Sequence, residues 1–317
     1  MTERAPLALA ALAALALLAT AAFLALNLRG DIGFALELRG ARLLALVCVG
    51  VAIATSTVVF QTVTGNRILT PSVMGLDALY GFVQIGLVFA LGGLGFATLD
   101  PRAKFAGETA LMTAMALALF LPMLRARLDM TLMLLSGVVL GVLLRSLSSL
   151  LARVIDPNDF AIASGASFAS FNAVRGDLLA VASVMTIAAC AVVWRVRHVL
   201  DVLALGQDAS TALGVDWRRT VAGLLALVAA LVAVSTALVG PMVFVGLLVV
   251  ALAERLVNTR RHAVLLPAAA LTAIVVLVGG QATLQHGLGG ASALAIVVEF
   301  AGGLLFLALL FAESRRR

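Results

Sequence analysis

Residues 220–240 read TVAGLLALVAALVAVSTALVG, a run of 21 residues without a charged side chain. At a rise of about 1.5 Å per residue, a helix of this length extends for about 31 Å, which matches the hydrocarbon core of a lipid bilayer. The apolar residues are continuous rather than alternating with polar ones, so the run does not fit a strand of a transmembrane barrel. The stretch therefore predicts a membrane-spanning α-helix.

The rest of the chain repeats this pattern. Apolar residues make up 63% of the 317 residues and charged residues only 12%, whereas about a quarter of a soluble domain is charged. The mean hydropathy is +1.15, and no long polar segment remains that would fold as a soluble domain. We predict an all-α polytopic membrane protein, a single transmembrane domain over residues 1–317, with about ten spans near residues 6–26, 43–62, 79–98, 106–124, 131–151, 178–194, 220–240, 242–257, 264–280 and 293–312.

Two of these runs are unusual. The run at 6–26 follows Arg4 and resembles a secretory signal, but it is longer than the usual apolar core of a signal peptide, so we expect it to remain as the first span. The run at 242–257 is short and carries Glu254 and Arg255 near its end. It follows Gly240-Pro241, and a proline at that point must interrupt the preceding helix.

The basic residues give the chain an orientation. If the N-terminus lies in the cytoplasm and the spans alternate, the cytoplasmic segments hold 14 basic residues, the outside segments hold 7, and Arg145 falls within a span. An excess of arginine in the cytoplasmic loops is what the positive-inside rule requires. We therefore expect an even number of spans, with both termini cytoplasmic.

Several classes of function are disfavoured. The net charge of +6 is spread over the gaps between apolar runs and forms no stripe, so we expect no nucleic-acid partner. Cys48 and Cys190 are interpreted as small packing residues within apolar runs, and His198, His262 and His286 are too far apart in sequence to suggest a metal site. The sequence has no GxxxxGK[ST] phosphate loop and no evident nucleophile–base pair. We expect no catalytic residues, no metal and no cofactor bound by this chain.

One predicted cytoplasmic segment, LALGQDASTALGV at residues 203–215, is the most informative. Gly206 can end one helix and Gly214 can close the next, which predicts a short surface helix over 207–213 with Asp208 near its start. Two interpretations are open: the helix is a solvated connector between two spans, or it is a contact surface for a soluble partner on the cytoplasmic side.

This segment resembles LxLGEEAARSLGV, the cytoplasmic coupling segment of permease subunits in iron–siderophore and cobalamin ABC importers. Three further blocks resemble the same family, in the family's order. FQTVTGNRILTPSVMGLDALYG at 60–81 is similar to Q-x-x-x-x-NPLAxPxxLGxxxGA, GPMVFVGLLV at 240–249 to GPIGFVGLVVPH, and ALAIVVEFAGGLLFLALL at 293–310 to GIVTALIGAPFFLYLL. The form NRILTPSVMGLD looks most like the branch associated with catecholate-type siderophores.

The chain also departs from the family pattern. Arg67 replaces the proline of the NPLA block, and Val250 and Ala251 replace the proline and histidine that close the GPIGFVGLVVPH block. These changes put the local helix breaks in doubt more than the transport role.

The resemblance implies which residues contact the energy source. In the family, the coupling segment binds the ATPase, which is a separate chain that uses ATP. The positions carried over to this sequence are Leu205, Gly206, Gln207, Asp208, Ala209, Ser210, Thr211, Ala212, Leu213, Gly214 and Val215.

The resemblance also implies sites at the two ends of the second span. Arg39 and Arg42, in RGAR where the family has RLPR, are expected outside and on one helix face. They would receive acidic residues of a binding protein, or else simply snorkel to the membrane interface. Asn66 and Ile68 align with the family's cytoplasmic gate, although Asn66 also suits a turn. Arg42 and Gln61 lie 19 residues apart, about 28 Å along a helix, which fits a membrane span between the two sites.

Three ionisable residues within the spans remain open to two interpretations. Arg145 either lines the transport pathway or pairs with an acid on a neighbouring helix. Glu299 and Glu254 raise the same question, and Glu254 beside Arg255 fits the inside interface.

Together these features predict a multi-pass permease of the cytoplasmic (inner) membrane, in a binding-protein-dependent ABC importer for a ferric siderophore. The implied partners are a second permease, identical or homologous, two ATPase subunits and an extracytoplasmic siderophore-binding protein. Cobalamin, haem or another metal chelate is the alternative cargo. A proton-coupled secondary transporter is the competing mechanism, although no inverted repeat is evident. An intramembrane enzyme would need a nucleophile–base pair or metal ligands, and neither is found.

Overall fold

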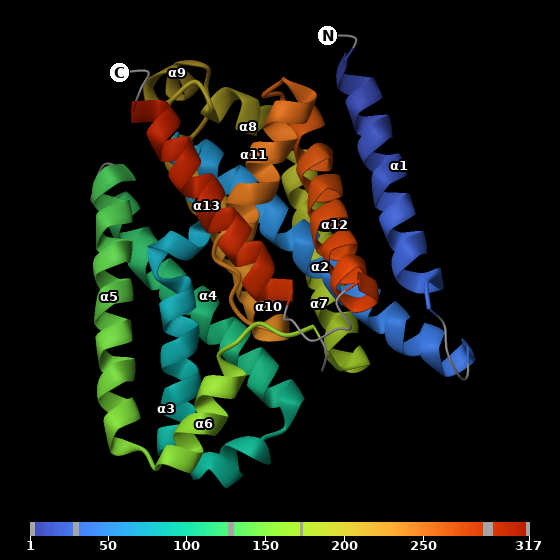
Figure 1. The fold of residues 1–317 in the computed structure, drawn as a ribbon. Helices are drawn as coiled ribbons and strands as arrows, with labels where there is room; N and C mark the ends of the chain where they lie inside the picture. Colours follow the sequence, from blue (N-terminus) through green and yellow to red (C-terminus); the bar gives the residue numbers. More distant parts are fainter. Residues whose placement is uncertain (1–3, 28–31, 126–129, 172–173, 288–293, 315–317) are drawn as a thin grey trace.

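The computed structural model describes residues 4–27, 32–125, 130–171, 174–287 and 294–314 (Figure 1). Within these ranges the regular structure is entirely helical. The elements are α1 (Arg4–Ala25), α2 (Ile32–Thr64), the 3₁₀ helix η1 (Pro71–Met74), α3 (Leu76–Ala97), α4 (Pro101–Arg125), α5 (Met130–Val154), α6 (Pro157–Ala166), α7 (Gly176–Arg195), α8 (Arg197–Leu203), α9 (Gln207–Ala212), α10 (Trp217–Val239), α11 (Val245–Val257), α12 (His262–Gly287) and α13 (Leu294–Ser314).

Each of the ten expected spans overlaps one of the long helices or α11. Eight helices in the described part of the chain are long and apolar enough to cross a membrane: α1, α2, α3, α4, α5, α7, α10 and α12. The last expected span corresponds to α13, which has 21 residues. These helices make the chain a multi-pass membrane protein, and the all-helical prediction is confirmed.

The expected span at 242–257 corresponds to a helix that is too short to cross a bilayer. Here α10 ends at Val239, and Gly240 adopts a φ of 98°, which only glycine tolerates easily. Helix α11 then begins at Val245 and has 13 residues, or about 20 Å, less than the bilayer core. The predicted break at Gly240-Pro241 is confirmed. Val250 and Ala251 lie within α11, which runs without interruption where the family has a proline.

Helix α2 is longer than the expected span at 43–62. It has 33 residues, or about 50 Å of helix, so it extends well beyond the bilayer core at its N-terminal end. Arg39 and Arg42 lie in this N-terminal extension of α2, in agreement with the prediction that they share a helix outside the membrane.

The centre of the fold is built on α2 and α10, which pack against each other and bury most of their side chains. Helix α12 covers α2 on one side and carries α1 on its outer face, while α3 joins α5 on the other side. Figure 1 shows α1 and α5 at opposite edges of the molecule. Many side chains of α5 are exposed in the single chain, including Leu135, Val139, Val142, Leu143 and Leu150.

The contact that holds α5 against the rest of the fold depends on glycine. Gly75 follows η1 with a φ of 83°, and a Cβ placed there would lie 2.9 Å from the backbone of both Gly137 and Gly141 on α5. The backbones therefore approach as closely as small residues allow between membrane helices. A side chain at Gly75 would force α5 away.

Both chain ends lie on the same side of the molecule. Helix α1 begins, and α13 ends, on the side where α8 and α9 lie, while α6 lies at the opposite end (Figure 1). This arrangement confirms the even number of crossings. With the charge distribution it makes the α9 side cytoplasmic.

Candidate functional site

The predicted surface helix in the cytoplasmic segment is present as α9. Gly206, at its N-terminal boundary, has a φ of 96°, and Gly214 beyond its end has a φ of 86°. Neither glycine would meet a neighbour if it gained a Cβ, so backbone conformation rather than space selects glycine at both positions. The helix bounds predicted from the two glycines agree with the structure to within one residue.

Helix α9 is fixed to α8 on one face and exposed on the other. Ser210 is fully buried, and its hydroxyl lies 2.6 Å from the Gly206 carbonyl oxygen and 3.0 Å from that of Val202 in α8. By contrast, Leu205 and Leu213 at the two ends of α9 are each 63% exposed. Large apolar side chains exposed on a cytoplasmic connector are suited to contact with another protein.

The segment between α2 and η1, residues 65–70, carries the two expected gate residues and is called the gate segment below. The Oδ1 atom of Asn66 accepts a hydrogen bond of 3.0 Å from the backbone N–H of Ile68, so Asn66 does form a turn, as one interpretation expected. Asn66 is exposed and Ile68 is half-buried. Both lie just beyond the cytoplasmic end of α2, and their role in a gate stays a prediction.

Two interactions hold this gate segment to its surroundings. The side-chain amide of Gln61 donates to the Arg67 carbonyl oxygen at 2.6 Å. The guanidinium of Arg67 lies 3.7 Å from the Glu254 carboxylate on α11. Arg67, which replaces a family proline, therefore joins the gate segment to α11, and Glu254 lies at the inside end of the fold.

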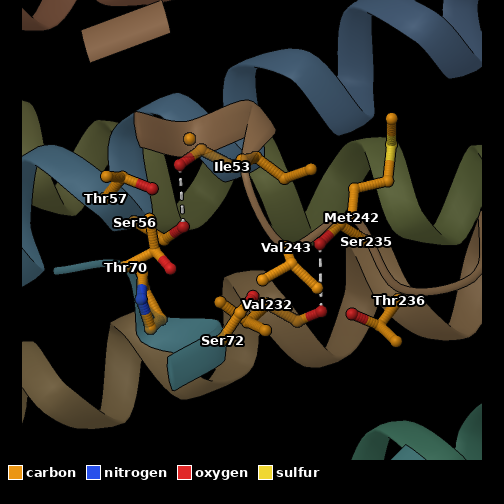
Figure 2. Close-up of a pocket in the computed structure, with 12 residues that line it drawn as sticks. Ile53, Ser56, Thr57, Thr70, Ser72, Val232, Ser235, Thr236, Met242 and Val243 are labelled. Carbon is orange, nitrogen blue, oxygen red and sulfur yellow. Dashed lines mark hydrogen bonds between the residues drawn. The ribbon is translucent and has the colours of Figure 1, made fainter. Parts of the chain in front are cut away.

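A hydroxyl-lined pocket lies where the gate segment meets the break before α11 (Figure 2). Ser56 and Ser235 donate to carbonyls of their own helices, α2 and α10. The hydroxyls of Thr57 and Thr70 are buried without a hydrogen-bond partner among the described residues. Polar groups scattered along separate segments carry no sequence signal, so the pocket was not predicted. It places hydroxyl groups between α2, α10 and the segments that precede η1 and α11.

The two arginines of RGAR have different surroundings. The Arg39 guanidinium donates to the carbonyl oxygens of Phe23, Leu24, Leu26 and Asn27 at 2.7–3.2 Å. These carbonyls lie at the C-terminal end of α1, where a cation is favourable because the last carbonyls lack intrahelical partners. Arg39 therefore caps α1, a contact that the sequence analysis did not foresee.

The surroundings of Arg42 are different. Its Nε is buried without a hydrogen-bond partner in the described part of the chain. Both arginines lie at the end of α2 opposite to α9, which is the extracytoplasmic side.

Arg145 lies on α5 and is exposed in the single chain. The carboxylate of Asp77, at the start of α3, is buried and close enough for an electrostatic interaction with it. The structure thus combines an exposed guanidinium with a nearby acid on another helix. Glu299, by contrast, accepts a hydrogen bond of 2.6 Å from the Val243 backbone N–H, which stabilises the irregular segment before α11.

The structure also brings together three side chains that the sequence did not connect. His262 lies between Asp201 and Thr62, within 2.6 and 2.7 Å of them. Among the described residues, no group of three or more His, Cys, Asp or Glu side chains is arranged to hold a metal ion. Cys48 and Cys190 are free thiols at the contact between α2 and α7.

The comparisons with known proteins agree with this arrangement. The Petrobactin import system permease protein YclO of Bacillus subtilis (strain 168) is 39% identical over 90% of this chain and 91% of its own length. The Petrobactin import system permease protein FatC of Bacillus anthracis is 30% identical over 84% of this chain and 76% of its own length. A solved metal-chelate type ABC transporter in an inward-facing conformation superposes with a TM-score of 0.84 at 21% identity, covering 97% of this chain and 99% of the other.

The family comparison covers nearly the whole chain. The match to the FecCD transport family spans residues 8–312, which covers most of α1, all of α9 and most of α13. The family match and the two import permeases named above disfavour the proton-coupled secondary transporter. The chain belongs to the FecCD transport family.

Proposed function

We propose that this chain is the permease subunit of a binding-protein-dependent ABC importer that carries a ferric siderophore across the cytoplasmic membrane. The observation that carries the proposal is the 39% identity to a petrobactin import permease over nine-tenths of the chain. The fold supports it, because a cytoplasmic helix with exposed apolar ends lies on the same side as the gate segment. Cobalamin, haem or another metal chelate is the alternative cargo.

The proposed assembly contains a second permease, identical or homologous, and two ATPase subunits. The exposed apolar face of α5 is the surface proposed to meet the second permease, with Arg145 beside the shared pathway. An ATPase subunit binds residues 205–215, where Leu205 and Leu213 supply apolar contact. Closure of the ATPases on ATP displaces α9 and opens or closes the gate at Asn66 and Ile68. The chain itself binds no cofactor, and ATP is used by the partner.

The activity is tested with the chain purified together with its co-expressed partners and reconstituted in proteoliposomes. We expect ferric petrobactin, supplied with the binding protein, to stimulate ATP hydrolysis and to accumulate inside. Ferric enterobactin, a ferric hydroxamate and cobalamin are the comparison substrates. Stimulation by cobalamin alone would assign a different cargo, and uptake without any ATPase would overturn the ABC mechanism.

Docking of the binding protein is proposed at the extracytoplasmic end of α2. We expect Arg42→Ala to weaken binding of the siderophore-binding protein about fivefold at low salt, with little change in thermal stability, since rim charges act through orientation and association rate. Arg39→Ala should lower stability by about 1 kcal/mol, because it uncaps α1. Binding is measured by surface plasmon resonance at two salt concentrations, and stability by thermal unfolding in detergent. Equal losses of stability in both variants would contradict the assignment of docking to Arg42 and of helix capping to Arg39.

A further inference from the structure

Three side chains from three separate helices meet at the cytoplasmic side of the fold. The ring of His262, the first residue of α12, is only 3% exposed. Its Nδ1 lies 2.6 Å from Asp201 Oδ1 on α8, and its Nε2 lies 2.7 Å from Thr62 Oγ1 on α2. The histidine thus joins α8 to α2 directly.

The chemistry of the three groups fixes the direction of one of these contacts. An ionised carboxylate only accepts hydrogen bonds, so Nδ1 of His262 carries a hydrogen and donates to Asp201. The backbone N–H of His262 donates to the same oxygen at 2.9 Å, so Asp201 also caps the start of α12. The Thr62 hydroxyl lies within hydrogen-bond distance of both the ring Nε2 and the Val58 carbonyl oxygen, the latter at 2.8 Å. Through Thr62, the ring is tied to the last turns of α2.

The two hydrogen-bond partners of His262 lie close to the two segments of the proposed transport cycle, which are α9 and the gate segment. On one side, Val202 follows Asp201 in α8, and its carbonyl oxygen lies 3.0 Å from the buried hydroxyl of Ser210 in α9. On the other side, the neighbour of Thr62 is Gln61, whose amide donates to the Arg67 carbonyl oxygen in the gate segment. Hydrogen bonds at Ser210, His262 and Gln61, joined through the backbone between Val202 and Asp201 and between Thr62 and Gln61, therefore link α9 to the gate segment.

We propose that His262 is a positioning residue that transmits the displacement of α9 to the gate segment at Asn66 and Ile68. The inference rests on the proposed function, because it needs an ATPase that moves α9. Two properties support it. The ring is buried, where hydrogen bonds are stronger than in water. The linked elements are helices, which move as units, so a movement of α8 must either carry α2 with it or break the contact at His262.

The test separates a transmitting role from a merely structural one. Thr62→Val removes the hydroxyl with little change in volume, and His262→Asn keeps a donor near the Nδ1 position while it removes Nε2. The matched control is Thr272→Val, because Thr272 is a buried threonine on α12, whereas Thr62 is half-buried, and among the described residues the Thr272 hydroxyl bonds to Ala268 of its own helix. Thr62→Ser is the conservative variant that retains the hydroxyl.

Gate movement is read from maleimide labelling of Asn66→Cys in the complete reconstituted complex, with and without ATP and vanadate, after Cys48 and Cys190 have been replaced by serine. We expect Thr62→Val and His262→Asn to reduce the nucleotide-dependent change in labelling rate at least fivefold and ferric petrobactin uptake at least tenfold. Basal ATP hydrolysis should remain within twofold of the starting complex. Thr62→Ser should restore both readouts, and Thr272→Val should leave them unchanged.

The outcomes distinguish this inference from the function on which it rests. If labelling depends on nucleotide in the starting complex but Thr62→Val and His262→Asn behave like Thr272→Val, His262 does not transmit the movement and the inference is overturned. If uptake and labelling are independent of nucleotide in the starting complex, the proposed function is contradicted, and the inference that rests on it is overturned as well. Loss of gate movement with basal hydrolysis intact, and its rescue by Thr62→Ser, supports transmission.

Discussion

Replacing Gln207–Ala212 by a Gly-Ser linker of equal length is expected to abolish co-purification of the ATPase and to reduce siderophore uptake to background. The linker removes α9, and with it the Ser210 contact that fixes this helix to α8. The exposed Leu205 and Leu213 remain in the chain, but they no longer flank a rigid helix. A flexible contact must be ordered upon binding, and the entropy of that ordering opposes association.

The experiment compares complexes isolated through a tag on the permease. Thr211→Ala is the matched control, since its hydroxyl bonds only to Gln207 within α9 and the helix should persist. We expect the linker variant to be as monodisperse in detergent as the starting protein, because α9 lies outside the apolar core. Retention of the ATPase by the linker variant would refute the assignment of residues 205–215 as the coupling segment.

Gly75→Ala is expected to have the largest effect on folding. The left-handed conformation at this position costs an L residue about 1–2 kcal/mol. In addition, the new methyl group would lie 2.9 Å from backbone atoms of Gly137 and Gly141, and overpacking of this kind costs about 1–3 kcal/mol. The sum is a large part of the total stability of a typical domain, about 5–15 kcal/mol.

We expect the yield of monodisperse protein to fall severely, and the surviving fraction to unfold at a clearly lower temperature. Gly86→Ala provides the control, because this glycine lies on α3 with open space where a Cβ would be added. Both variants are followed by size-exclusion chromatography after heating in detergent. Equal behaviour of Gly75→Ala and Gly86→Ala would show that the contact between η1 and α5 is not limiting for stability.

Local features of the chain were readable without a structure. The helix α9 is bounded by Gly206 and Gly214, and the break after α10 is set by Gly240-Pro241. In each case a residue with unusual backbone freedom or restriction acts on its immediate neighbours, so sequence position alone is sufficient. The apolar runs were similarly readable, because burial of the backbone in lipid requires continuous helices.

Contacts between residues far apart in the sequence could not be predicted in the same way. Arg39 was expected either to receive a binding protein or to snorkel to the interface, and neither interpretation included the cap that its guanidinium forms on α1. His262 appeared in the sequence only as a histidine near the end of a span, whereas it joins α8 to α2 across 61 and 200 positions of sequence separation. A histidine followed by a helix, with an acid in the preceding cytoplasmic segment, is a weak signal that would not have singled out this pair.

The sequence by itself determined that this chain is an all-helical membrane protein with both ends on the cytoplasmic side, and it located the segment proposed to bind the ATPase. These properties depend on apolar length, charge asymmetry and glycine positions, all of which act locally along the chain. Tertiary structure alone decided that Arg39 caps α1, that Arg67 pairs with Glu254 and that His262 joins α8 to α2. Those pairings depend on how helices far apart in sequence are packed, and a hydrogen bond or ion pair forms only when packing brings its two partners within reach.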